Sequence, residues 1–265
     1  MPPLALVGNL SFDLIEGGPP QPGGAPFHSA RAWRALHVHA TMIARCARED
    51  ERRFRRTFAR LGVPVHIASG RETTTFAFRY ENEQRIMEVV HMGDAWSPAD
   101  VTGVPYGGWV HVAPLLRGDF PARTLAAAAR GRRISFDAQG LTRVRATGPL
   151  RLEPEPELAP LLRHVSILKL AEEEAIALVG GIDPDALAAL GPPEVVVTFG
   201  SRGSLVVADG NATEVTTHHI DADPTGSGDM FAAAYLASRA SGHAPASAAR
   251  RATGIVSGLL SGRVS

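Results

Sequence analysis

Short apolar runs alternate with helical patterns along most of this 265-residue chain, and this alternation restricts the fold more than any other feature. The apolar runs are at residues 4–8, 40–44, 109–113, 133–137, 165–168 and 195–199. The helical patterns are at residues 51–61, 122–130, 172–179, 226–238 and 246–260. Strands that alternate with helices form a mostly parallel sheet covered on both faces. The sequence therefore predicts a single α/β domain over residues 1–265, with a doubly wound sheet.

One segment interrupts this alternation. Residues 73–80 (TTTFAFRY) alternate between polar and apolar side chains, residues 81–84 (ENEQ) contain a turn signal, and residues 85–91 resume an extended pattern. This pattern predicts a β-hairpin with no helix beside it. We expect the hairpin, at about residues 71–92, to project from the α/β body as a lid over a site or as a dimerisation element.

Composition argues against several classes of protein. Hydrophobic residues make up 45% of the chain and charged residues 20%, which is typical of a soluble globular protein. The 27 basic residues balance the 27 acidic residues, so a nucleic-acid partner is not expected. No apolar run approaches the roughly 18 residues of a membrane span. The single cysteine, Cys46, excludes an internal disulfide, and the N-terminus has no basic, apolar leader, so we expect a cytoplasmic protein.

The stretch at residues 223–236 (DPTGSGDMFAAAYL) carries the strongest chemical signal. Gly226, Ser227 and Gly228 directly precede a long helical pattern, so they should lie at a helix N-terminus, where unpaired N–H groups and the helix dipole favour an anion. Asp229 then places a carboxylate beside that anion, whereas a carboxylate that only capped the helix would lie earlier, near Asp223. We predict that Asp229 is the base for a hydroxyl that attacks a bound phosphoryl group.

This stretch resembles the C-terminal signature of the ribokinase-like, or PfkB-type, carbohydrate kinases. Other segments occur where that family would place them: residues 7–13 (VGNLSFD), 23–30 (GGAPFHSA), 169–174 (KLAEEE) and 198–203 (TFGSRG). The resemblance extends over nearly the whole chain. It implies a ribokinase-like fold and an enzyme that transfers the γ-phosphoryl group of ATP, with Mg²⁺, to a hydroxyl of a small polyhydroxylated molecule.

The resemblance also implies a role for each matched position. The residues that would bind the acceptor are Asp13, Gly24 and His28. The residues whose N–H groups would stabilise the transferring phosphoryl group are Gly226, Ser227 and Gly228. The residues that would contact the nucleotide are Lys169, which is the chain's single lysine, Thr198, Gly200 and Gly203. The residue that would hold Mg²⁺, through water, is Glu174.

Two positions depart from the family's pattern. His28 stands where the substrate loop usually has Asn, and Ala171 stands where the segment before Glu174 usually has Asn. His28 can still hydrogen-bond a hydroxyl. The loss of Asn at position 171 would weaken the hold on Mg²⁺ and on the phosphates. These departures leave open a slow enzyme or a pseudokinase that binds sugar and nucleotide without turnover.

Three features bear on the acceptor: the compact interval between Asp13 and Gly23, His28, and residues 137–140 (DAQG). They resemble inositol-kinase-type members of the family, so we expect myo-inositol ahead of ribose or fructose. The same compact interval predicts that the lid consists of the single hairpin. Phe27, together with Phe76 and Phe78 in the hairpin, could provide a surface on which a base stacks, so a nucleoside acceptor stays open.

Other enzyme classes lack their motifs here. The chain contains no G-x-x-x-x-G-K-[ST] loop, no G-x-G-x-x-G after the first strand and no G-x-S-x-G elbow. A Walker-type NTPase, a dinucleotide oxidoreductase and an esterase of the nucleophile-elbow type are therefore not expected.

Overall fold

Alternate residues of the first strand, β1 (Leu4–Asn9), pack into two different hydrophobic cores in the computed structural model, which describes residues 1–81, 84–217 and 222–263. Leu4 and Leu6 belong to one core, whereas Ala5 and Val7 belong to the other. A strand that is buried on both faces belongs in a parallel sheet between two helical layers.

Among the described residues, the large sheet has nine strands in the order β14-β13-β12-β11-β9-β8-β1-β4-β5. The strands other than β1 are β4 (Thr41–Ala47), β5 (His66–Gly70), β8 (Trp109–Ala113), β9 (Arg133–Asp137), β11 (Ile167–Ala171), β12 (Glu194–Thr198), β13 (Ser204–Ala208) and β14 (Asn211–Val215). All neighbours from β5 to β12 are parallel, and β13 and β14 form an antiparallel edge. The predicted mostly parallel sheet is confirmed.

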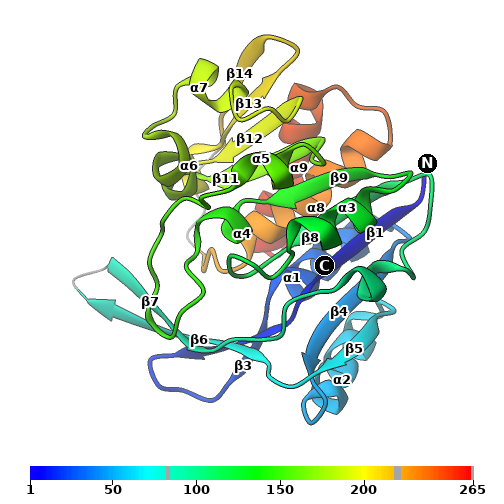
Figure 1. Ribbon diagram of the computed structural model, residues 1–265, viewed down its shortest axis with the longest axis vertical. Coiled ribbons are helices and arrows are strands. Elements are labelled where there is room, and N and C mark those ends of the chain that lie inside the picture. The colour runs from blue at the N-terminus through cyan, green and yellow to red at the C-terminus, as the bar shows by residue number, and fades with distance from the viewer. Residues whose placement is uncertain (82–83, 218–221, 264–265) are drawn as a thin grey trace.

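Helices cover both faces of this sheet (Figure 1). The helices that pack in the core of Leu4 are α1 (Ala25–Ala35), α2 (Glu51–Leu61), α8 (Ser227–Ala240) and α9 (Pro245–Leu260). The helices that pack in the core of Ala5 are η1 (Pro98–Val101), α3 (Ala122–Ala129), α4 (Gln139–Thr142), α5 (Leu158–Leu162), α6 (Glu172–Val179) and α7 (Pro184–Ala188). One short helix, η2 (Gly200–Arg202), follows β12. The fold is therefore doubly wound, as the sequence predicts.

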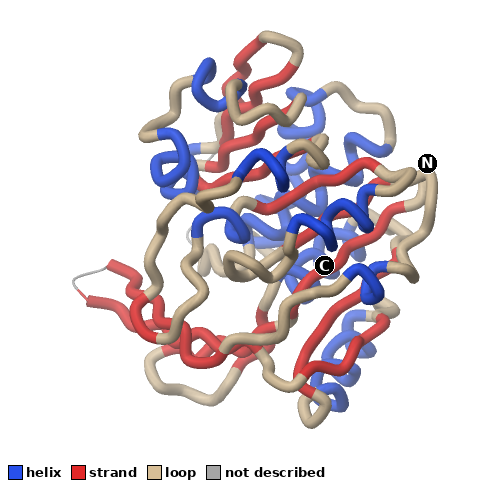
Figure 2. The backbone as a smooth tube through the Cα atoms, in the orientation of Figure 1, coloured by secondary structure: helices blue, strands red, loops and turns tan. Residues whose placement is uncertain are grey.

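A second sheet lies beside the C-terminal end of β1. Its strands, in spatial order, are β10 (Gly148–Pro149), β7 (Gln84–His91), β6 (Thr74–Glu81), β2 (Ser11–Ile15) and β3 (Gln21–Gly23). The hairpin β6–β7 projects from the body in Figure 1, and in Figure 2 the red strands of this sheet stand apart from the blue helices. We call these five strands the lid sheet.

The lid sheet corrects the prediction of a single hairpin. The predicted hairpin is present, but β2 pairs with β6 in parallel, and β3 and β10 extend the two sides. An isolated hairpin is only marginally stable, because its strand edges are unpaired and its apolar face is uncovered. The short interval between Asp13 and Gly23 suggested a reduced lid. In the structure, this part of the chain contributes β2 and β3, which are two of the five strands.

Among the described residues, no helix has both the length and the apolar character needed to cross a lipid bilayer. The boundaries predicted for the helices at residues 51–61 and 172–179 match α2 and α6, and those predicted for the strands at residues 109–113 and 133–137 match β8 and β9. The other predicted helices and strands differ from the structure by one to three residues at an end.

Candidate active site

The anion loop, Gly226–Gly228, lies at the N-terminus of α8, as the sequence predicts. Gly226 has a positive φ of 75°, which favours glycine. A Cβ at this position would lie only 2.0 Å from Nδ1 of His28, so the imidazole ring of His28 packs directly against the loop. His28 thus lies between the predicted acceptor residues and the anion loop, rather than on the acceptor side alone.

The N–H groups of the loop differ in one respect from the prediction. The N–H of Ser227 donates to the carbonyl oxygen of Pro224 at 2.9 Å and closes the turn before α8. Among the described residues, the N–H groups of Gly226 and Gly228 have no such partner, so these two remain available to an anion. Ser227 still lines the cavity, but its backbone N–H is already used.

Asp229 lies in the first turn of α8, directly after the loop, and its side chain is half-buried in the site. Burial, followed by the nearby charge of Asp137, raises the pKa of Asp229 to about 7. Its Oδ1 atom is buried, and no described residue hydrogen-bonds to it. A carboxylate with this pKa and one unpartnered oxygen can accept a proton near neutral pH.

Lys169, in the middle of β11, directs its ammonium group at the same loop. Its Nζ lies 3.2 Å from Oδ2 of Asp137, and it would lie 3.1 Å from a Cβ at Gly228. Burial alone would lower the pKa of Lys169, but the carboxylates of Asp137, Glu174 and Asp229 outweigh it and raise that pKa. Lys169 is therefore a fixed positive charge beneath the N-terminus of α8.

Glu174 lies in the first turn of α6, and its Oε2 accepts the N–H of Ala171 at 2.8 Å. The side chain is almost fully buried, and burial raises the pKa of its carboxyl group while Lys169 opposes the shift. Ala171, at the start of the same helix, contributes no side-chain oxygen. The structure thus brings the carboxylates of Glu174 and Asp229 within electrostatic reach of Lys169.

The predicted nucleotide residues Thr198, Gly200 and Gly203 all line one cavity with the anion loop. The hydroxyl of Thr198 donates to the carbonyl oxygen of Leu170 at 3.1 Å. Gly203 also has a structural requirement, because its φ is 107° and a Cβ would lie 2.0 Å from the carbonyl oxygen of Val215. A glycine at position 203 is therefore needed by the backbone whatever is bound.

The predicted acceptor residues line the part of the same cavity that the lid sheet walls, which we call the acceptor end; the volume of the whole cavity is about 530 Å³. Asp13 is 7% exposed, and its Oδ1 accepts a hydrogen bond of 3.2 Å from the hydroxyl of Ser11. Gly24 permits close approach to the backbone of β1, because a Cβ would lie 2.6 Å from the carbonyl oxygen of Asn9. The apolar side chains that line this end are Phe76, Phe78, Met87 and Leu115.

Sequence reasoning assigned no chemical role to Asp137 or Arg143. Asp137 ends β9 and holds Lys169, and Arg143 lines the cavity close enough to lower the pKa of Asp229. The signal that could have found Asp137 is its place at the carboxyl end of a parallel strand, where ligand sites of open α/β sheets occur. No comparable signal marked Arg143.

The side-chain oxygens at the site suit a magnesium ion that is held through water. Among the described residues, no group of three or more His, Cys, Asp or Glu side chains could enclose a metal ion. Mg²⁺ often keeps several waters and binds through one or two carboxylates plus substrate phosphates. The buried carboxylate of Glu174 fits that arrangement.

A doubly wound α/β sheet, an anion loop at a helix N-terminus and a carboxylate beside it define a phosphotransferase of the ribokinase-like fold. The family model of the pfkB family carbohydrate kinases matches residues 20–257. The chain belongs to this family.

Solved structures of similar proteins support the same assignment. A pyrophosphate-dependent kinase in the ribokinase family, complexed with a pyrophosphate analogue and myo-inositol, has 25% identity and a TM-score of 0.86, covering 97% of this chain and 95% of its own. The Vibrio cholerae fructokinase with fructose, ADP and calcium has 24% identity and a TM-score of 0.73, and the match covers 97% of this chain and 91% of the fructokinase chain. The Thermotoga maritima ribokinase has 15% identity and a TM-score of 0.72, covering 98% and 93%. The last two show the fold alone.

Proposed function

We propose that this protein transfers a phosphoryl group from a polyphosphate donor to a hydroxyl of a cyclitol, with myo-inositol as the first acceptor to test and sugars next. The observation that carries the proposal is the juxtaposition of Asp229, with one unpartnered carboxylate oxygen, and the anion loop that precedes it. A base and a phosphoryl site are thereby adjacent in a cavity that Asp13 and His28 also line, and the ring of His28 packs against the anion loop.

The residues divide the chemistry as follows. Asp229 accepts the proton of the attacking hydroxyl as the new O–P bond forms and the bond from phosphorus to the donor's bridging oxygen breaks. The N–H groups of Gly226 and Gly228, with the ammonium of Lys169, stabilise the negative charge on the transferring group. Magnesium, when bound, neutralises charge on the donor phosphates, and Glu174 would hold it through water. Asp13 fixes the acceptor by accepting a hydrogen bond from at least one of its hydroxyls.

The shape and chemistry of the acceptor end favour a cyclitol. A six-membered ring with mostly equatorial hydroxyls presents C–H groups on its faces and hydroxyls at its rim. Phe76, Phe78 and Met87 provide apolar surface for a ring face, whereas Asp13 and Ser11 provide polar groups for the rim. The similarity to a kinase solved with myo-inositol supports the same choice.

Two donors are supported by different observations. The cavity continues past the anion loop to Val256 and Leu260 of α9, which leaves room for a nucleoside and supports ATP. Lys169 and Arg143 place two positive charges near the loop, and the similarity to a pyrophosphate-dependent kinase supports pyrophosphate. We take ATP with Mg²⁺ as the first candidate and pyrophosphate as the second.

The test is a phosphoryl-transfer screen followed by ³¹P NMR. Purified protein is incubated with ATP or pyrophosphate, Mg²⁺, and each of myo-inositol, ribose, fructose, adenosine and cytidine. The proposal predicts a new phosphomonoester signal with myo-inositol. A nucleoside phosphorylated at least tenfold faster than any cyclitol or sugar would overturn the acceptor. Tight donor binding without any product would favour a pseudokinase.

A further inference from the structure

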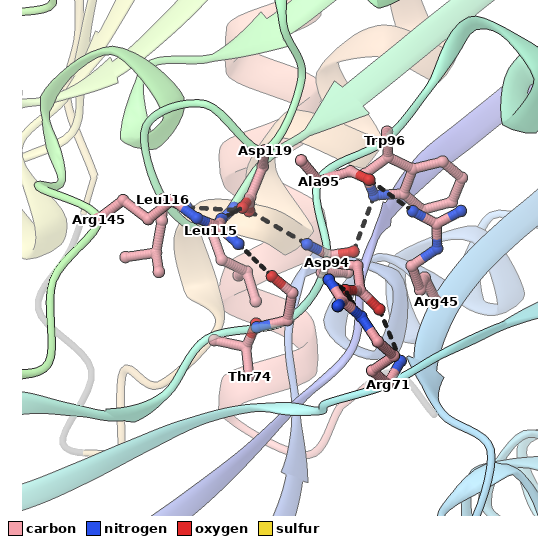
Figure 3. Close-up of polar contacts among 12 residues, drawn as sticks. Arg45, Arg71, Thr74, Asp94, Ala95, Trp96, Leu115, Leu116, Asp119 and Arg145 are labelled. Atoms are coloured by element: carbon pink, nitrogen blue, oxygen red, sulfur yellow. Dashed lines mark hydrogen bonds and ion pairs between the residues drawn. The ribbon is translucent and has the colours of Figure 1, made fainter.

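A polar network centred on a buried carboxylate joins the lid sheet to the large sheet beside the acceptor end of the cavity (Figure 3). Its centre is Asp119, in the loop after β8, which is 1% exposed. The Oδ2 atom of Asp119 accepts the N–H groups of Leu115 and Leu116 at 2.8 and 3.1 Å, and the side-chain amide of Asn9 at 3.2 Å. The Oδ1 atom accepts a hydrogen bond from Arg145.

Arg145 carries the network to the lid sheet. One Nη atom of its guanidinium donates to Asp119, and the other donates to the carbonyl oxygen of Gly93, just after β7. The N–H of Gly93 in turn donates to the hydroxyl of Thr74 at 2.9 Å, at the start of β6. Arg145 therefore contacts the point where the hairpin β6–β7 begins and ends.

The partners of Asp119 form or adjoin the acceptor end of the cavity. Leu115 lines the cavity and packs with Phe76 and Phe78 of the lid sheet. Asn9 ends β1 and directly precedes the segment that carries Asp13, and its Oδ1 accepts the indole N–H of Trp96 at 2.8 Å. One carboxylate thus connects the apolar wall of the acceptor end with the strand that leads to its polar group.

We propose that Asp119 and Arg145 form a clamp that positions the lid sheet over the acceptor, so that Arg145 is a positioning residue for acceptor binding. This inference rests on the proposed function in one respect: it takes the molecule bound under the lid sheet to be the acceptor. A planar guanidinium can hold a carboxylate and a carbonyl in one fixed geometry, which an ammonium group cannot do. Arg145 itself does not line the cavity, so it acts through the elements it connects.

The variant Arg145→Gln tests the positioning role of Arg145 while Asp119 keeps most of its hydrogen bonds. Oδ2 of Asp119 retains its hydrogen bonds from Asn9, Leu115 and Leu116, and the amide of the new Gln can still donate to Oδ1 in place of Arg145, so the fold should tolerate the change. Arg145→Lys is the conservative variant, which keeps the charge but not the two-pronged geometry. Arg117→Gln is the matched control, because Arg117 also donates to backbone carbonyl oxygens, those of Glu153 and Pro154, but makes no contact with Gly93 or Asp119 through its side chain.

The experiment measures amide hydrogen exchange in β6 and β7, together with KM for myo-inositol and for the donor. The clamp predicts that Arg145→Gln speeds exchange in these strands about tenfold, the effect of losing a charged hydrogen bond, with no change in β12 and β13. It also predicts that KM for the acceptor rises about tenfold, whereas KM for the donor stays within about twofold of the wild-type value. Arg145→Lys should lie between Arg145→Gln and the wild type, and Arg117→Gln should match the wild type.

The hydrogen-exchange result does not depend on any acceptor being phosphorylated, so failure of the proposed function and failure of the clamp are distinguishable. Unchanged exchange in β6 and β7 of Arg145→Gln would overturn the clamp. Exchange that increases equally in β12 and β13 would also overturn it, because Arg145 would then contribute only to global stability.

Discussion

The two ends of the cavity are built in different ways. The donor end consists of charged groups on or beside the large sheet: Lys169 and Asp137, which are buried, and Asp229, which is half-buried. The acceptor end is walled by apolar side chains of the lid sheet, such as Phe76 and Met87, over a single carboxylate, Asp13. Charge stabilisation in phosphoryl transfer requires groups that do not move, whereas recognition of the acceptor can be assigned to a smaller sheet held by polar contacts.

The largest expected effect is at the donor end. Asp229→Asn should lower turnover by a factor of about 10² to 10⁴, the range for loss of a positioned base, because the amide cannot accept the hydroxyl proton. Donor binding, measured by calorimetry, should remain because the anion loop is intact. The control is Asp209→Asn, an exposed carboxylate in the β13–β14 turn. Wild-type turnover in Asp229→Asn would contradict the assigned base.

The contact between the two ends can be tested at Gly226. Gly226→Ala forces an L side chain into a left-handed conformation and places its Cβ 2.0 Å from His28, so we expect a loss of about 3 kcal/mol of stability in urea unfolding. In a His28→Ala background the space is free, and the loss should fall to about 1 kcal/mol, the strain alone. Equal losses in both backgrounds would show that His28 does not press on the loop.

A smaller effect is expected at the lid sheet. Met87 lines the cavity, whereas Ile86, the residue before it on β7, does not. Met87→Ala should raise KM for the acceptor about fivefold, the equivalent of about 1 kcal/mol of lost apolar contact, without changing KM for the donor. Ile86→Ala should leave both constants unchanged. A fall in turnover with constant acceptor KM in Met87→Ala would place the lid side chains in the chemistry instead.

The smallest effect is a gain at the donor end. Ala171→Asn adds an N-cap side chain to α6, whose Glu174 already accepts the N–H of residue 171, so it should stabilise the protein by about 1 kcal/mol. It should also increase Mg²⁺ affinity or turnover about threefold, because it restores a polar group beside the metal's carboxylate. Thermal unfolding and a magnesium titration of activity measure the two effects. A gain in stability alone would mean that position 171 has no part in holding the metal.

The donor end was the easier of the two to predict from sequence, for a physical reason. Its loop, base and helix are contiguous from Gly226 onward, so one motif contains the geometry. The acceptor end combines β2, β6, β7 and the loop around Leu115, and only tertiary pairing brings them together. The parallel pairing of β2 with β6, which turned a predicted hairpin into a five-stranded sheet, leaves no local signal in the sequence. The same holds for Arg145, because its partners are distant in the chain.

The dependence of kcat/KM for the acceptor on pH tests the central claim most directly. A base must be ionised to accept a proton, and the pKa of Asp229 is raised by burial to about 7, so activity should rise with pH through about 7 and then level off. The residual activity of Asp229→Asn should lack this rise. A wild-type profile that is flat between about pH 5.5 and 8.5, or the same rise in Asp229→Asn, would contradict the account.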